Sequence, residues 1–175
     1  MKKLIMLVLV SILALTLGGC KKETKVTFLS GQDIFTQGGT YFVVFYRDDC
    51  PDCESVKPLV ITYLELLRDE PKEYEGKSTI YAVNLSDPAN EGIYRTYSEA
   101  RKGWGPGQGD SGTFWVDGVE DFDMLYIGET AALISIGTTL EGATKATFQA
   151  AGYDAIYARL TEHLGLEQQE QQQYQ

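Results

Sequence analysis

Two cysteines separated by two residues, Cys50 and Cys53 in a Cys-Pro-Asp-Cys motif, are the residues in this sequence best suited to chemistry. They follow an apolar segment at 41–46 and open a segment at 51–68 that has helical spacing. Unpaired backbone N–H groups and the helix dipole stabilise a thiolate at a helix N-terminus. We therefore predict that Cys50 is the more exposed, nucleophilic thiol. Cys53, one turn later, should be a buried resolving thiol that closes a Cys50–Cys53 disulfide.

Two thiols at this spacing have other uses, which the sequence makes less favourable. A structural zinc site needs four ligands, but the chain has only one further cysteine, Cys20, and one histidine, His163. A purely structural disulfide would close a small ring and remove comparatively little entropy from the unfolded chain. We favour redox chemistry and predict no metal site and no cofactor, with metal delivery by the reduced pair as a weaker alternative. His163 is interpreted as a partly exposed helical residue, not as a partner of Cys50.

The segments beside the cysteines predict an α/β domain. Residues 41–46 are aromatic or β-branched without interruption, as in a central strand covered on both faces. Apolar residues in 51–68 recur at intervals of three and four, which predicts a helix with one buried face. Residues 79–83 predict a second strand. A strand, a helix and a strand of these lengths form a β-α-β unit, so the sheet should be partly parallel.

Other elements are predicted on both sides of this unit. The pattern indicates an edge strand at 26–29, a shorter helix at 88–101, a strand at 113–116 before an Asp-Gly turn, and a strand at 133–136. The chain then predicts an amphipathic helix with Gly165 as its C-cap. The apolar face of that helix would consist of Phe148, Ala151, Ile156, Tyr157, Leu160 and Leu164.

Composition and charge exclude several classes of protein. The 175 residues are 43% hydrophobic and 23% charged, which is typical of a single globular domain. Acidic residues outnumber basic ones by 25 to 15, and the formal net charge is −10. Nucleic-acid binding needs clustered basic groups, so no nucleic-acid partner is expected. The Gln-rich residues 167–175 are predicted to form a disordered tail.

The N-terminus predicts export from the cytoplasm. Two lysines precede an apolar run at 4–17, which has the length of a signal-peptide core and is short for a spanning helix. The run ends in Leu-Gly-Gly before Cys20, which resembles the bacterial lipobox. We predict a lipoprotein signal peptide at 1–19, with lipidated Cys20 and a tether at 20–25. The domain at 26–166 would then be lipid-anchored at the extracytoplasmic face of a bacterial membrane. An ordinary short membrane anchor is the alternative.

The apolar strand, the Cys-Pro-Asp-Cys motif and Pro58 together resemble the thioredoxin superfamily, in which a helix proline recurs five residues after the second cysteine. The resemblance covers about residues 25–164 and implies a central mixed sheet with helices on both faces. It implies thiol–disulfide exchange with protein thiols and disulfides, with Cys50 forming the mixed disulfide and Cys53 resolving it. An insertion relative to the minimal fold is expected around 101–126.

Besides this insertion, the sequence departs from the family pattern at two further places. The family usually has a cis-proline facing the active site, but no proline fits here. In the preferred register Ala131 takes that position, and in the alternative register Gly112 does. We expect a trans peptide there, because a non-proline cis bond costs about 2.5–4 kcal/mol. The buried acid of thioredoxins proper and its lysine partner correspond to Val44 and Ala82.

The motif is also surrounded by acidic residues, with only Arg47 opposing them nearby; these are Asp48, Asp49, Asp52 and Glu54. Their charges should disfavour a Cys50 thiolate and make the pair more reducing. The sequence thus predicts a membrane-anchored thiol–disulfide oxidoreductase with a membrane redox partner. The alternative is an accessory lipoprotein of the same fold whose cysteine pair is structural or vestigial. The direction of exchange stays open among reduction, oxidation and isomerisation.

Overall fold

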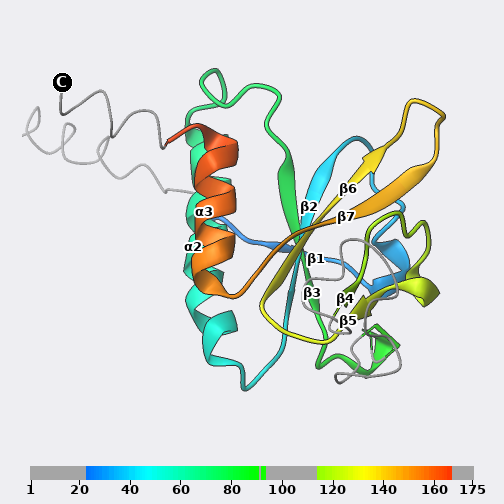
Figure 1. The fold of residues 1–175 in the computed structure, drawn as a ribbon. Helices are drawn as coiled ribbons and strands as arrows, with labels where there is room; N and C mark the ends of the chain where they lie inside the picture. The colour runs from blue at the N-terminus through cyan, green and yellow to red at the C-terminus, as the bar shows by residue number, and fades with distance from the viewer. Residues whose placement is uncertain (1–22, 91, 94–113, 167–175) are drawn as a thin grey trace, which may run out of the picture.

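A computed structural model describes residues 23–90, 92–93 and 114–166. Its centre is a five-stranded sheet in the order β1-β3-β2-β6-β7 (Figure 1). The strands are β1 (Thr27–Phe28), β2 (Tyr41–Tyr46), β3 (Thr79–Asn84), β6 (Ala132–Thr138) and β7 (Thr144–Ala151). The α-helices in the described residues are α2 (Pro51–Asp69) and α3 (Tyr153–Leu164). This arrangement confirms the predicted α/β class.

The sheet is mixed because its two halves are built differently. β2 and β3 are parallel and are joined by α2, which is the predicted β-α-β unit. β1 pairs in parallel with β3 and forms the edge, as predicted. β6 runs antiparallel to β2, and β7 runs antiparallel to β6. The end of β2 that leads into α2 therefore lies beside the beginning of β6.

The central strand β2 separates two cores. Its side chains alternate between the two faces of the sheet, yet every one of them is buried. Phe42, Val44 and Tyr46 belong to the core under the helices, and Tyr41, Val43 and Phe45 belong to the core on the other face. This is the two-sided burial that the uninterrupted apolar run predicted.

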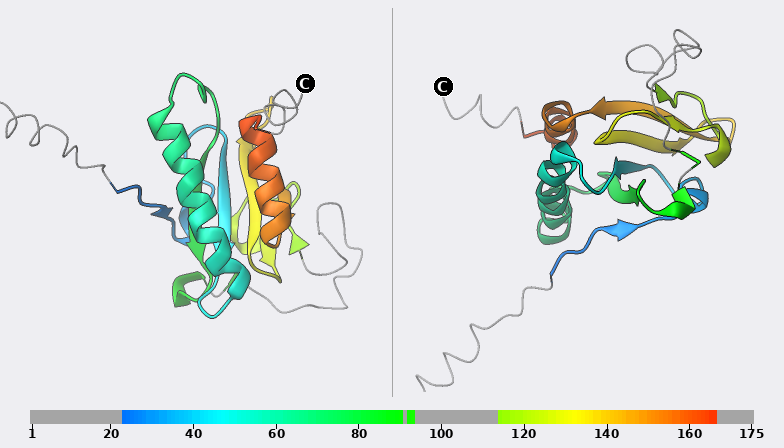
Figure 2. Two further views of the ribbon diagram at one scale, coloured as in Figure 1. Left: turned by 90° about the vertical axis from the view of Figure 1, so that its left-hand side faces the viewer. Right: turned by 90° about the horizontal axis from the view of Figure 1, so that it is seen from below.

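Both described α-helices cover the same face of the sheet and lie side by side (Figures 1 and 2). The expectation of helices on both faces is therefore wrong for the described part of the chain. The opposite face is covered by a two-stranded antiparallel sheet of β4 (Phe114–Trp115) and β5 (Tyr126–Ile127), with the 3-10 turns η1 (Gly31–Asp33), η2 (Pro88–Asn90) and η4 (Phe122–Met124). Buried side chains such as Ile34 and Leu125 fill this second core without an α-helix.

Parts of two predicted segments fall outside the described residues. The helix predicted at 88–101 begins as the 3-10 turn η2, and of its remainder only 92–93 is described. The region around 101–126 is described from Phe114 onward. There the predicted short strand is present as β4, and the Asp-Gly turn at 117–118 is confirmed.

β7 replaces the beginning of the predicted C-terminal helix. Phe148 and Ala151 were expected on that helix, but both lie in β7 and pair with β6. Apolar spacing within one segment does not reveal a partner strand, and here that partner decides the structure. α3 begins only after Gly152, whose φ is 78°. It ends at Gly165 in the left-handed conformation, so the predicted C-cap is confirmed.

His163 is half-buried near the end of α3, in agreement with its interpretation as a partly exposed helical residue. Its ring packs edge-on against Phe42, with ring centroids 4.9 Å apart. Its Nε2 accepts the backbone N–H of Ser78 at 3.2 Å, which requires an unprotonated Nε2. Burial lowers the pKa of His163, and the charges of Lys77 and Arg159 lower it further, against the opposing charge of Glu162.

We therefore predict that the free energy of unfolding falls as the pH drops from about 7.5 to 5.5. In the unfolded chain His163 binds a proton near pH 6.5, whereas in the folded protein it does so only at lower pH. The contribution of neutral His163 to the free energy of unfolding is therefore complete above pH 6.5 and is lost as the pH falls below it. The slope should not exceed about 1.4 kcal/mol per pH unit. Urea unfolding across this range measures it. His163 is the only histidine, so His163→Gln should flatten the profile; an unchanged slope would contradict the assignment.

Candidate functional site

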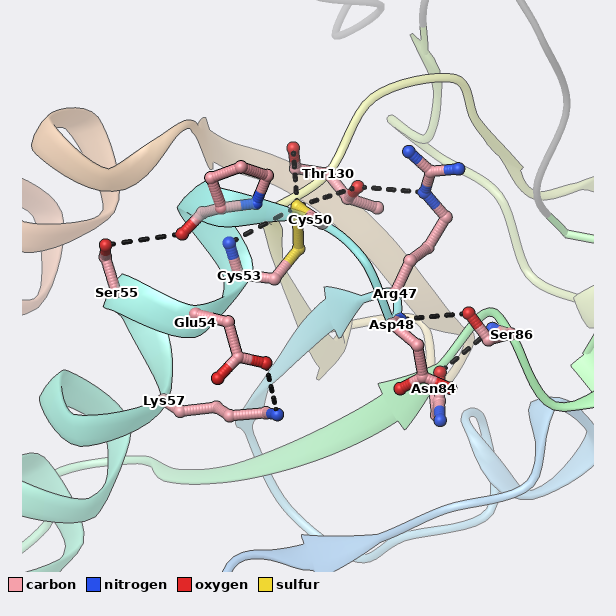
Figure 3. Close-up of a disulfide and its surroundings, with 11 residues drawn as sticks. Arg47, Asp48, Cys50, Cys53, Glu54, Ser55, Lys57, Asn84, Ser86 and Thr130 are labelled. Carbon is pink, nitrogen blue, oxygen red and sulfur yellow. Dashed lines mark hydrogen bonds and ion pairs between the residues drawn. A yellow bond between two sulfur atoms is a disulfide. The ribbon is translucent and has the colours of Figure 1, made fainter.

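The disulfide lies where β2 ends and α2 begins (Figure 3). In the connecting turn Asp49 has a φ of 60°, a left-handed conformation that Asp adopts more readily than most residues. The turn makes Cys50 the N-cap of α2 and places Pro51 in the first turn, where its missing N–H leaves no helix bond unmade. The Cys50 sulfur accepts the backbone N–H of Cys53 at 3.3 Å. The predicted position of Cys50 at the helix N-terminus is thus confirmed.

Cys50 and Cys53 form the predicted intramolecular disulfide, with their Cα atoms 5.2 Å apart. Both residues are buried, but not equally: Cys50 is 6% exposed, whereas Cys53 is 0% exposed. The predicted order of exposure is therefore correct. Cys50 is therefore the more accessible of the two residues. The roles of nucleophile and resolving thiol themselves stay predictions.

The loop before β6 supplies a second wall of the site. Thr130 lies against Cys50, with its hydroxyl 3.4 Å and its carbonyl oxygen 3.6 Å from the Cys50 sulfur. The side chain of Arg47 donates from Nε to the Thr130 hydroxyl at 3.2 Å (Figure 3). These two residues are far apart in the sequence, and only the antiparallel pairing of β2 with β6 brings them together. The sequence indicated Arg47 only as a charge that opposes the acidic residues, and no local pattern indicated that Thr130 contacts Cys50.

Ala131, the preferred equivalent of the family's proline, is fully buried and follows Thr130 directly beside the disulfide. The expectation of a trans peptide here is wrong, because the Thr130–Ala131 bond is cis. That expectation used only the intrinsic preference of a peptide bond. In the folded protein the Ala131 carbonyl accepts the N–H of Gly152, and the Thr130 carbonyl faces Cys50. Gly112, the alternative position, lies outside the described residues.

The Cys53 side of the disulfide adjoins an apolar cavity of about 430 Å³. Val44 and Ala82 are paired on neighbouring strands, and both line this cavity together with Cys53. The positions that correspond to a buried acid and its lysine partner therefore hold two apolar side chains next to Cys53. Neither can transfer a proton to or from the sulfur, so that proton must come from water or from another group.

The Cys50 side adjoins a polar cavity of about 390 Å³. It is lined by Arg47, Asp52, Gly128, Glu129, Thr130, Ala151 and Gly152, and it reaches Cys50 only through the contact of Thr130 with the sulfur. A polar peptide segment fits such a surface better than a lipid does, because it can exchange hydrogen bonds with these groups. Cys53 thus lines a mainly apolar cavity, whereas Thr130, which contacts the Cys50 sulfur, lines a polar one.

Among the described residues, no group of three or more His, Cys, Asp or Glu side chains could hold a metal ion. His163 bonds to Ser78 and packs on Phe42, which places it at the opposite end of α3 from Gly152 and the disulfide. Cys20, the predicted lipidation site, lies outside the described residues. No helix within the described ranges is long and apolar enough to cross a membrane.

The chain was compared with protein-family models and with curated proteins. No protein-family model matches it, and no curated protein matches it.

We predict that Asp49→Asn combined with Asp52→Asn lowers the pKa of the Cys50 thiol in the reduced protein. Both carboxylates are exposed on the turn and the first helical turn beside Cys50, where negative charge disfavours a thiolate. Asn tolerates the left-handed conformation of position 49, so the turn should survive. Titration of the thiolate absorbance should show a decrease of about half a pKa unit to one unit.

Glu141→Gln is the matched control for this prediction. Glu141 is exposed in the turn between β6 and β7, at the opposite end of the sheet from Cys50. The substitution removes one negative charge from the same protein. That charge lies so far from Cys50 that solvent and salt screen its effect on the thiol. A double variant that titrates like this control would refute the proposed effect of the acidic residues.

Proposed function

We propose that this protein is a thioredoxin-like thiol–disulfide oxidoreductase, anchored by a lipid at Cys20 to the extracytoplasmic face of a bacterial membrane. The observation that carries the proposal is the environment of the Cys50 sulfur. It caps α2 and accepts the N–H of Cys53 and the hydroxyl of Thr130. Both are hydrogen-bond donors suited to a negative sulfur, and the resolving thiol is one helical turn away.

The proposed reaction exchanges two electrons between this pair and a substrate disulfide. In the reducing direction, the Cys50 thiolate attacks one sulfur of the substrate, and the other substrate sulfur leaves as a thiolate that takes a proton from water. The Cys53 thiol loses its proton to water and attacks the Cys50 sulfur of the mixed disulfide. The second substrate thiol is released, and the Cys50–Cys53 disulfide remains. The same steps in reverse oxidise a substrate dithiol.

The topology supports the finer, thioredoxin-like part of the proposal. The motif opens the helix of a β-α-β unit, an antiparallel hairpin extends the same sheet, and the C-terminal helix packs beside the motif helix. The loop at Thr130–Ala131 approaches Cys50 at the place where the resemblance puts a substrate-binding loop. The proposed substrates are protein thiols or disulfides whose extended main chain lies in the polar cavity. A membrane protein would restore the redox state of the pair.

The redox equilibrium of the pair is the first test. The full chain in detergent is incubated in graded thiol–disulfide buffers, and alkylation followed by mass analysis measures the oxidised fraction. We expect a reversible transition between about −120 and −270 mV, the range of exchange proteins. A pair that stays oxidised below about −300 mV and equilibrates slowly would instead indicate a structural disulfide. That result would favour the accessory lipoprotein, for which the near-complete burial of both cysteines is the supporting observation.

A trapping experiment tests the roles of the two thiols. Cys53→Ser should accumulate mixed disulfides with substrate proteins through Cys50, because the resolving attack is lost. Cys50→Ser should accumulate several-fold fewer, since Cys53 is fully buried. Non-reducing electrophoresis of both variants measures the difference, with the double variant as the blank. Equal trapping by the two single variants would contradict the assigned roles.

A further inference from the structure

Arg47, Thr130 and Cys50 form a chain of two hydrogen bonds that the proposed exchange reaction does not by itself require. Arg47 Nε lies 3.2 Å from the Thr130 hydroxyl oxygen, which lies 3.4 Å from the Cys50 sulfur (Figure 3). A hydroxyl group has one proton and two lone pairs, whereas a guanidinium group can only donate. Arg47 therefore occupies a lone pair of Thr130 and leaves the hydroxyl proton for the sulfur.

Thr130 offers the Cys50 sulfur two groups with opposite effects. Its carbonyl oxygen, 3.6 Å from the sulfur, can accept a hydrogen bond only from a protonated thiol. Its hydroxyl can donate, and a donor favours the thiolate over the thiol. A free hydroxyl could turn its proton elsewhere. The hydrogen bond from Arg47 fixes its direction, so the donating arrangement prevails.

The charges around Cys50 make such a device useful. Carboxylates surround the motif: Asp48 and Asp49 lie in the turn before Cys50, Asp52 and Glu54 in the first turn of α2, and Glu129 in the loop before β6. Lys57 is engaged with Glu54 at 2.8 Å. Among the described residues that line the polar cavity beside Cys50, Arg47 is the only cation.

We propose that Arg47 is a positioning residue, which holds the Thr130 hydroxyl as a hydrogen-bond donor to Cys50 and thereby stabilises the thiolate of the reduced protein. The inference rests on the proposed function, because it concerns the nucleophile of that reaction. The hydrogen bond from the Thr130 hydroxyl to the Cys50 sulfur is weak while the sulfur belongs to a disulfide. It strengthens when reduction and loss of the thiol proton make the sulfur an anion. The arrangement opposes the effect of the surrounding carboxylates.

The test measures the reactivity of Cys50 in the chemically reduced full chain, with no substrate protein present. Alkylation by iodoacetamide is followed against pH, and mass analysis of peptides assigns the rate to Cys50. Thr130→Val keeps the shape of the side chain but has no hydroxyl, and Arg47→Met keeps an unbranched stem of similar reach but has no donor. Each variant should slow alkylation near neutral pH by about threefold to tenfold. Thr130→Ser, which retains the hydroxyl, should stay within about twofold of wild type.

A double-mutant cycle separates positioning from simple charge. If Arg47 acts through Thr130, Arg47→Met should have no further effect in the Thr130→Val background. If it acts only as a nearby cation, its effect should be undiminished there and should weaken at about 1 M salt, which would overturn the proposal. A wild-type rate for Thr130→Val would overturn it as well. Urea unfolding of the reduced variants excludes a loss of fold as the cause.

Failure of this test can be distinguished from failure of the proposed function. A pair that fails to exchange with redox buffers in its oxidised form can still show the predicted alkylation profile once it is chemically reduced. Conversely, an active oxidoreductase whose Cys50 reacts equally fast in Thr130→Val has no such hydrogen-bond chain. The redox titration therefore tests the proposed function, and the alkylation experiment separately tests the role of Arg47.

Discussion

The site depends on the short turn that converts the end of β2 into the beginning of α2. β2 is buried on both faces, so its direction is fixed by two cores. Within the turn, the left-handed conformation of Asp49 reverses the chain and makes Cys50 the N-cap residue. The same connection leaves Arg47 beside Thr130 in the loop before β6. One rigid strand thus positions the sulfur, the helix dipole and the guanidinium group together.

The two sulfur atoms differ because the two sides of α2 meet different partners. Cys53 faces the sheet, where Val44 and Ala82 form part of an apolar cavity. Cys50 faces the loop before β6, where the wall is polar. A low-polarity environment disfavours a thiolate at Cys53, and hydrogen-bond donors favour one at Cys50. This asymmetry fits a pair in which the first thiol reacts with a substrate and the second resolves the intermediate.

Charge and hydrogen bonding act in opposite directions on Cys50. The exposed carboxylates of the turn and the first helical turn disfavour its thiolate, but solvent and salt screen such charges. The hydrogen bonds from Cys53 and Thr130 act at contact distance and are screened far less. The reactivity of Cys50 is the balance of these two effects.

The sequence alone determined the elements that local patterns encode. The apolar run of β2, the helical spacing of α2 and the capping positions of Cys50 and Gly165 all follow from neighbouring residues, and the structure confirms them. Only the tertiary structure decided what depends on distant segments. Phe148 belongs to a strand because β6 pairs with it, and Thr130 reaches Cys50 because β6 runs antiparallel to β2. Contacts of this kind arise from sheet pairing, and the pattern within one segment does not reveal which segment pairs with it.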